Sequence, residues 1–401
     1  MRQPPSLTLL IFIAMASPLA LNAFVPAMPD AAKALHTDIS TIQVTFTAYL
    51  LTLAFGQLIS GPLADFFGRR PVLLTGLGLH VAGSLLAAQA TGVEWLIAGR
   101  VLQALGGSTA MVLARTIILD VHGRAGAAGR MGYVVMAIAI AQSIAPTLGG
   151  YLNLWSGWQS IFYVSIVMGA LVWLFALLRL PETCIERSDS LRLGSLFSRY
   201  GEVLQSGQYL GYALSTTAIA SAFYLFVGSS PYLVVDQLQG DSADFGLWFL
   251  AVSLAFMLGS FSSTQLARHF SIDQMVLLGN GLSLVGTLVL LLAALFGALS
   301  FATLFLPMAL VTFGRGLSQP NAQSAAISCA SGSAGTASGL MGFIQLLTGA
   351  AIAQLVPSLL ELGITTLFSC MLLAPCVALL AHWQAWRAGR QTTDSASAPG
   401  H

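Results

Sequence analysis

Long apolar segments, separated by short polar stretches, recur along the whole chain. Twelve of them reach the length of about 20 residues that a helix needs to cross the hydrocarbon core of a bilayer. They lie near 7–29, 41–64, 71–91, 94–119, 129–153, 158–180, 208–233, 244–267, 272–298, 301–328, 334–358 and 361–386. The pattern predicts an all-α membrane protein with twelve transmembrane helices. With eleven apolar segments after the first, we expect that first segment to be an uncleaved span rather than a signal peptide.

One polar stretch is much longer than the others and divides the predicted spans six and six. It covers residues 181–207 and reads "PETCIERSDSLRLGSLFSRYGEVLQSG". We therefore expect an N-terminal bundle in 1–180, a cytoplasmic linker in 181–207 and a C-terminal bundle in 208–387. The final segment, 388–401, is polar and rich in small residues, which predicts a disordered cytoplasmic tail.

The composition narrows the class of protein. Charged residues make up only 8% of the chain and hydrophobic residues 56%, whereas soluble domains carry about 25% charged residues. The chain has no basic run that would bind nucleic acid. Lys and Arg gather on one side of the predicted spans, so the positive-inside rule places both termini in the cytoplasm. The four cysteines lack CxxC spacing and histidine partners, which predicts neither a disulfide framework nor a metal site.

The loop between the second and third predicted spans carries the most specific motif, "GPLADFFGRRPVLL" at 61–74. Six of its positions match the loop signature of the major facilitator superfamily: Gly61, Leu63, Asp65, Gly68, Arg69 and Arg70. The stretches "IQVTFTAYLLTLAFGQLISGPLADFFGRRP", "GSSPYLV" and "QPNAQSAAIS" resemble the Bcr/CflA-type drug–proton antiporters of that superfamily. The resemblance covers nearly all of residues 10–380.

The resemblance implies a fold and a function. Two six-helix bundles would surround a central cavity that opens alternately to each side of a bacterial inner membrane. The chain would export drugs or amphipathic metabolites in exchange for protons, as a monomer and without a cofactor. It contains no HExxH or GxSxG motif, so we expect no enzymatic activity. The alternatives are a dedicated exporter of an anionic metabolite or siderophore and, more remotely, a membrane sensor that does not transport.

The resemblance also assigns gating roles to two groups of residues. In the 61–74 loop, Asp65 would approach the N-terminus of the eleventh span near Ser333, Gly68 would form the turn, and Arg69 would reach Asp120. In the fifth span, "AQSIAPTLGG" at 141–150 resembles the antiporter motif, with Ala145 in place of its first glycine. The second gating group comprises the motif residues Pro146, which removes a backbone donor, and Gly149 and Gly150, which permit close helix packing.

Proton coupling is the point at which the sequence departs from the family. Arg100, in "LIAGRVLQALGG", matches the family's arginine motif and would face the cavity, with Gln103 one helical turn away. Relatives commonly carry an aspartate where this chain has Asn22, and an amide does not titrate. His80, in the third span, and Asp30, at the end of the first, are the candidate carriers. If they do not carry the proton, we expect His80 to have a structural role and Asp30 to pair with Lys33.

Arg315 lies in the tenth predicted span, in "FGRGLSQPN", where a transmembrane helix should carry no charge. It either binds an anionic group of the substrate, together with Arg100, or caps backbone carbonyls near the break at Pro320. Polar and aromatic residues within the spans are further candidates for the cavity wall. They are Tyr49, Gln142, Phe223, Tyr224, Asn321 and Gln345.

Overall fold

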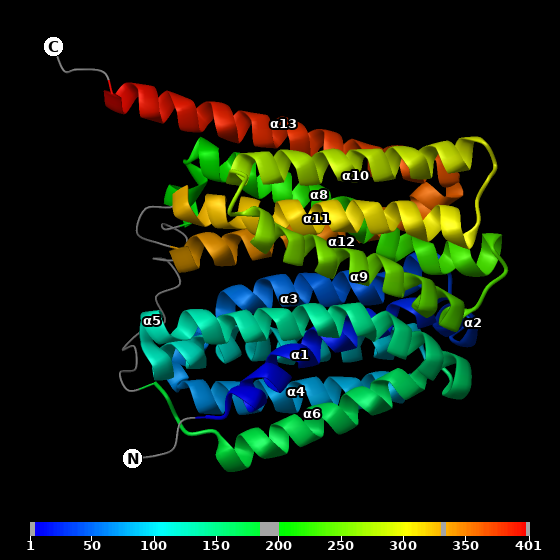
Figure 1. Ribbon diagram of the computed structural model, residues 1–401. Coiled ribbons are helices and arrows are strands. Elements are labelled where there is room, and N and C mark those ends of the chain that lie inside the picture. The colour runs from blue at the N-terminus through cyan, green and yellow to red at the C-terminus, as the bar shows by residue number, and fades with distance from the viewer. Residues whose placement is uncertain (1–4, 185–199, 330–333, 398–401) are drawn as a thin grey trace. The chain divides into compact units, whose positions relative to one another are not determined.

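The computed structural model is built from helices, and it describes residues 5–184, 200–329 and 334–397 (Figure 1). The helices of the first half are α1 (Leu7–Ala23), η1 (Val25–Ala27), α2 (Met28–Ala34), α3 (Ile39–Phe67), α4 (Arg69–Ala88), α5 (Val93–Ser156) and α6 (Gln159–Arg179). Those of the second half are α8 (Gly207–Tyr232), η2 (Leu233–Gln237), α9 (Ser242–Leu266), α10 (Ile272–Leu295), α11 (Phe301–Cys329), α12 (Ala334–Glu361) and α13 (Ile364–Ser397).

Twelve helical segments of the described chain are long and apolar enough to cross a membrane, which confirms the predicted spans. Four of these spans do not each coincide with one α-helix, and one of them, Gly207–Gln237, continues from α8 into η2. The first, Leu7–Ala34, is interrupted by η1 at Pro26, and α5 contains two spans, Val93–Gly123 and Arg130–Ser156. Gly123 makes the kink within α5, because its φ of 64° belongs to the left-handed region that other residues rarely adopt.

The chain folds into two compact units. The first comprises Met1–Arg192 with Gly228–Leu250, and the second comprises Leu193–Val227 with Ala251–His401. The ends of α8 and α9 around their connection therefore pack with the helices of the first half. The division into bundles 1–180 and 208–387 stays a prediction.

In the first unit, α5 packs against α1, α3 and α4, and α4 also packs against α6. The buried core at one end of these helices is aliphatic, with Leu10, Leu73, Leu77, Leu113 and Ile117 among its members. In the second unit, α10 packs against both α11 and α13 (Figure 1). Its core contains Tyr209, Tyr212, Val276, Ala326 and Met341. Small residues at these contacts allow the helices to approach closely.

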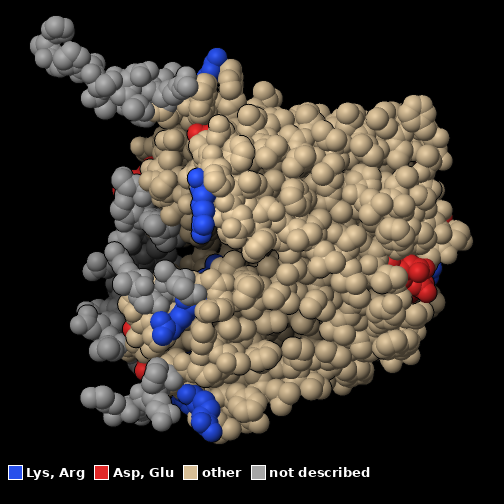
Figure 2. Space-filling model, in the orientation of Figure 1, with Lys and Arg blue, Asp and Glu red and all other residues tan. Residues whose placement is uncertain are grey.

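The surface is that of a membrane protein. On the face shown in Figure 2, a broad band is uncharged, and basic and acidic side chains lie at its margins. Large apolar side chains are exposed along the helices, for example Leu178, Phe261 and Leu373. A soluble protein rarely exposes so much contiguous apolar surface, whereas lipid chains would cover it.

The tail differs from its prediction. We expected 388–401 to be disordered, but the described backbone of α13 stays helical to Ser397. Ala, Arg and Gln in this segment are good helix formers, and after Pro375 the next proline is Pro399. Much of the linker 181–207 lies outside the described residues.

Candidate functional site

Arg100 lies in the first span of α5, completely buried within the first unit. Its guanidinium carbon is 4.0 Å from the centre of the Tyr49 ring, 5.3 Å from that of Phe24 and 5.9 Å from that of Phe162. The faces of aromatic rings attract cations, most strongly where water is excluded. Three helices, α1, α3 and α6, or their immediate flanks, thus supply an aromatic environment for one positive charge.

Polar groups satisfy only part of this guanidinium. Nη1 donates to the carbonyl oxygen of Ala20 at 3.1 Å and to Oε1 of Gln103 at 2.7 Å. Nε and Nη2 have no hydrogen-bond partner, and Arg100 forms no ion pair with any residue that the structure describes. A buried donor without a partner costs about 1–3 kcal/mol, and more when it is charged. Arg100 is therefore a cation that retains unused hydrogen-bonding capacity.

The hydrogen-bond chain continues from Gln103 into α4. Its Nε2 donates to Oγ of Ser84 at 2.7 Å, and the Ser84 hydroxyl donates to the carbonyl oxygen of His80. On the other side of the arginine, the hydroxyls of Tyr49 and Ser17 lie 2.9 Å apart. Asn22 is not part of this network, because its Nδ2 donates to the carbonyl oxygen of Pro18 one turn earlier in α1. The structure thus brings Tyr49, Arg100 and Gln103 together.

His80 is buried between α4 and α5. Its Nδ1 lies 3.0 Å from the carbonyl oxygen of Gln103, and a Cβ on Gly106 would lie 2.5 Å from its backbone nitrogen. The carbonyl oxygen can accept a hydrogen bond from the Nδ1–H of a neutral imidazole, so this contact can be made without any charge on the ring. These surroundings are those of a residue that fixes the packing of two helices.

A charged cluster, which we call the Arg69 cluster, joins α3, α4, α5 and the segment after α6. Nε of Arg69 donates to Oδ2 of Asp120 at 3.0 Å, and its Nη1 pairs with Asp65. The backbone amides of Arg69 and Arg70 donate to the carboxylate of Glu182 at 2.9 and 3.2 Å. These amides begin α4, so the acid occupies the positive end of the helix dipole. Gly68 makes the preceding turn with a φ of 104°.

The contact between Arg69 and Asp120 is the one that the sequence predicted. The region around Ser333, expected opposite Asp65, lies outside the described residues. The sequence analysis did not single out Glu182. The signal in the sequence that could have identified it was an acid in a Pro-Glu pair directly after the sixth span.

Near the C-terminal end of α5, the backbone packs so closely that side chains are excluded. A Cβ on Gly149 would lie 1.8 Å from the carbonyl oxygen of Ala23, and one on Gly150 would lie 2.1 Å from that of Ser242. A Cβ on Gly246, in α9, would lie 2.8 Å from Cα of Thr147. Glycine is required at these positions because two backbones occupy the space of a methyl group.

Polar bonds cross the same contact, which we call the α5 seam. The Ser242 hydroxyl donates to the carbonyl oxygen of Gly150 at 3.0 Å, and Thr147 donates to that of Gly246 at 2.7 Å. Nδ2 of Asn153 donates to Oδ2 of Asp30 at 2.6 Å and to Ser242 Oγ at 3.0 Å. Among the described ion pairs, none joins Asp30 to Lys33. Sequence reasoning missed Asn153 and Ser242.

In the second unit, Arg315 is held much as Arg100 is in the first. Its guanidinium carbon lies 4.5 Å from the centre of the Phe223 ring and 5.3 Å from that of Phe256. Nε donates to Oε1 of Gln319 at 2.7 Å. Unlike Arg100, Arg315 is only half-buried. The sequence did not single out Phe256, which is one of 22 phenylalanines in the chain.

The remaining cavity candidates have different environments. Tyr224 packs on α12, where a Cβ on Gly349 would lie 2.6 Å from its ring, and Gln345 has a buried Nε2 without a hydrogen-bond partner. Asn321 donates to Ser263 Oγ and to the carbonyl oxygen of Leu317, both at 2.7 Å, and so ties α11 to α9. Gln142 is exposed. Asn321 therefore resembles a packing residue more than a ligand contact.

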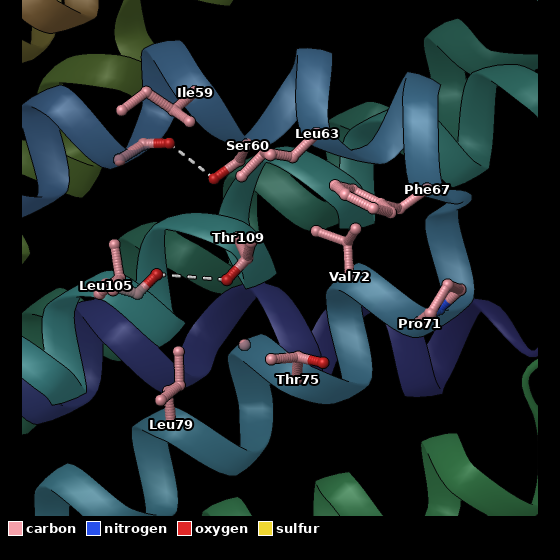
Figure 3. Close-up of a pocket in the computed structure, with 12 residues that line it drawn as sticks. Ile59, Ser60, Leu63, Phe67, Pro71, Val72, Thr75, Leu79, Leu105 and Thr109 are labelled. Atoms are coloured by element: carbon pink, nitrogen blue, oxygen red, sulfur yellow. Dashed lines mark hydrogen bonds between the residues drawn. The ribbon is translucent and has the colours of Figure 1, made fainter. Parts of the chain in front are cut away.

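A cavity of about 370 Å³ lies between α3, α4 and α5 in the first unit (Figure 3). Apolar side chains such as Ile59, Leu63 and Leu79 line it. The hydroxyls of Ser60 and Thr109 donate to carbonyl oxygens of their own helices. The cavity therefore presents an apolar wall and contains none of the side chains predicted for the site.

Comparison with known proteins places this architecture in a family. The model of the Major Facilitator Superfamily matches residues 10–353. Multidrug resistance protein D of Escherichia coli is 28% identical over 89% of this chain and 89% of its own length. A bicyclomycin resistance protein homologue of Haemophilus influenzae is 26% identical over 86% of this chain and 87% of its own.

A solved structure confirms the fold. It is that of a bacterial homologue of the human lysosomal transporter Spinster, which aligns with a TM-score of 0.74 at 15% identity over 96% of both chains. The relatives and the family are transporters, so this multi-pass chain is a membrane transporter of small molecules and not an enzyme. The chain belongs to the major facilitator superfamily, and its predicted resemblance to the Bcr/CflA-type drug antiporters is confirmed.

Proposed function

We propose that this protein exports drugs or amphipathic metabolites across a bacterial inner membrane by proton antiport and alternating access, as a monomer with both termini in the cytoplasm. The observation that carries the proposal is the similarity to proteins named for drug resistance over nearly nine-tenths of the chain. Antiport and the direction of transport rest on this similarity together with the geometry at the kink and at the C-terminal end of α5.

The kink of α5 and its C-terminal end support alternating access. Asp120 belongs to the Arg69 cluster, while Gly149, Gly150 and Asn153 belong to the α5 seam. Backbone-on-backbone packing is stable only when the helices are fully together, so a seam of this kind favours two discrete states over a continuum. In this account, the seam closes the outer side of the transporter and the Arg69 cluster acts on the inner side.

Asp30 is the proton carrier that the geometry favours. Its carboxylate accepts the short bond from Asn153, which also bonds to Ser242. Protonation removes the negative charge and weakens a charge-assisted hydrogen bond, which is about twice as strong as a neutral one. A proton on Asp30 would therefore loosen the α5 seam. His80 lacks such a link, because its described bond is to a backbone carbonyl within the α4–α5 contact.

Growth of an efflux-deficient bacterial host tests the function. Expression of the wild-type chain should raise the inhibitory concentration of bicyclomycin or chloramphenicol severalfold. Arg100→Gln should abolish the gain, whereas Arg387→Gln, which alters an arginine stacked on Trp383 within α13, should keep it. No gain for any of a broad set of drugs, despite normal amounts of wild-type protein in the membrane, would reject drug export.

The carrier is tested separately in energised vesicles. Asp30→Asn should uncouple drug transport from the pH gradient, while His80→Gln should reduce stability and leave coupling intact. Full coupling in the Asp30→Asn variant would exclude Asp30 as the carrier.

A further inference from the structure

Arg315 sits near the centre of α11, about 21 Å of helix from either end. The glycines beside it fix the backbone at this point. A Cβ on Gly314 would lie 2.3 Å from the carbonyl oxygen of Gly279 in α10, and one on Gly316 would lie 2.5 Å from that of Phe256 in α9. Since both neighbours are locked against other helices, the arginine side chain starts from a rigid position. Rigid placement is what a binding residue needs.

The side chain is oriented but not neutralised. Phe223 and Phe256 provide ring faces for the guanidinium, and Gln319 occupies its Nε. Nη1 and Nη2 form no hydrogen bond to any group that the structure describes, and Arg315 takes part in no described ion pair. Nη1 and Nη2, which can donate two parallel hydrogen bonds to a carboxylate, are thus the nitrogens without a described partner.

The acids described in the second unit are placed elsewhere. Asp273 lies in the first turn of α10 and accepts a hydrogen bond from the Tyr212 hydroxyl at 2.7 Å. Glu361 ends α12, and Glu202 precedes α8. Each therefore belongs to the end of a helix, whereas Arg315 lies at the centre of one. A guanidinium at that depth is costly unless an anion or water meets it.

The structural explanation for Arg315 lacks the contact that it requires. If the arginine capped carbonyls freed by Pro320, a bond from its guanidinium to a backbone oxygen of α11 should be present. Its one described hydrogen bond goes instead to the side chain of Gln319. The helix break at Pro320 therefore does not explain the presence of a charged residue at Arg315.

Other polar side chains belong to the helices around the arginine. Tyr224 follows Phe223 in α8 and packs on Gly349 of α12. Gln345 lies one turn before Gly349, on the same side of α12, and its buried Nε2 has no hydrogen-bond partner among the residues that the structure describes. A carboxylate accepts up to four hydrogen bonds and so has room for an amide donor in addition to the arginine fork.

We propose that Arg315, held between Phe223 and Phe256, binds the carboxylate of an amphipathic organic anion, whose apolar part the aromatic rings contact. This assignment adds amphipathic organic anions to the substrates of the transporter and rests on the proposed export function. Arg100 differs, because it is completely buried and lies in its own aromatic enclosure. The second unit thus supplies the cation that meets the substrate.

Two fluorescent ligands that differ only in charge test the proposal, dansylglycine and its neutral amide, dansylglycinamide. Fluorescence titration of the purified protein should show tighter binding of the carboxylate. Arg315→Gln should weaken dansylglycine binding about ten- to a hundredfold and change dansylglycinamide binding less than threefold. Arg315→Lys should restore part of the difference, since it keeps the charge and loses the planar fork. Arg387→Gln is the matched control, because Arg387 also stacks on an aromatic ring.

The outcomes separate this proposal from the export function. An equal loss for both ligands in Arg315→Gln, or no preference of the wild type for the carboxylate, overturns the carboxylate site and leaves drug export standing. If the host gains no drug resistance but the charge-selective binding is present, export is wrong and the binding site is right. Thermal unfolding of each variant shows whether a loss reflects misfolding.

Discussion

Replacement of Gly150 by alanine should open the α5 seam. The new Cβ would lie 2.1 Å from the carbonyl oxygen of Ser242, and Cβ atoms essentially never come closer than 3.0 Å to another heavy atom. The oxygen must retreat by about 0.9 Å, and because it belongs to the backbone, the start of α9 must move with it. That shift stretches the bond from the Ser242 hydroxyl to Gly150, now 3.0 Å long.

The expected magnitude follows from these contacts. Overpacking of this kind costs about 1–3 kcal/mol, and loss of the hydrogen bond adds about 1 kcal/mol. The better helix propensity of alanine returns roughly 1 kcal/mol. The balance, about 1–3 kcal/mol, corresponds to roughly a five- to 150-fold shift away from the state that contains the seam.

Labelling of a single cysteine measures this shift. Ala243 is buried beside the seam; Ala243→Cys, in a chain whose four native cysteines are replaced by serine, should react slowly with a maleimide. Gly150→Ala should raise that rate at least fivefold. The control is Gly132→Ala, in the same helix, where a Cβ would meet no atom within 4 Å. Equal rates for the two variants would refute the close packing inferred for Gly150.

Two further substitutions test the polar contacts. Gln103→Leu leaves the Arg100 Nη1 with one acceptor, the carbonyl oxygen of Ala20. The substitution should lower the free energy of unfolding by about 1.5–3 kcal/mol, seen as a lower unfolding temperature and as lost export. Unchanged stability would contradict the network. Glu182→Gln removes the charge at the start of α4 and should destabilise the protein by about 0.3–1 kcal/mol, an effect that should shrink in high salt; a loss independent of salt would argue against the helix dipole.

The sequence predicted the features that depend on local pattern. Twelve spans follow from the length of apolar runs, and the turn that the loop motif predicted at Gly68 is present, with a positive φ. The contact of Arg69 with Asp120 could be predicted because the loop motif is specific. Tyr49 was predicted only as a polar aromatic residue within a span. Its contact with Arg100 was not predicted.

What escaped prediction depends on which residues meet across helices. Asn153 and Ser242 are 89 positions apart, and neither is unusual at the end of a transmembrane segment. Phe256 becomes informative only when α9 brings it to Arg315. Helical periodicity identifies a face but not its neighbour, so such pairs require the tertiary structure. The tail was assigned from composition, which weighs polarity more than the absence of a proline before Pro399.

Transport by purified protein in liposomes tests the central claim, proton-driven export, most directly. Chloramphenicol is neutral, so a pH gradient alone does not concentrate it. With an acidic lumen, outward proton flow through an antiporter should drive the drug inward above its external concentration, and collapse of the gradient with an ionophore should release it. Protein-free liposomes set the background. Accumulation that is the same with and without the gradient, for chloramphenicol and for every drug to which the chain confers resistance, would contradict proton antiport.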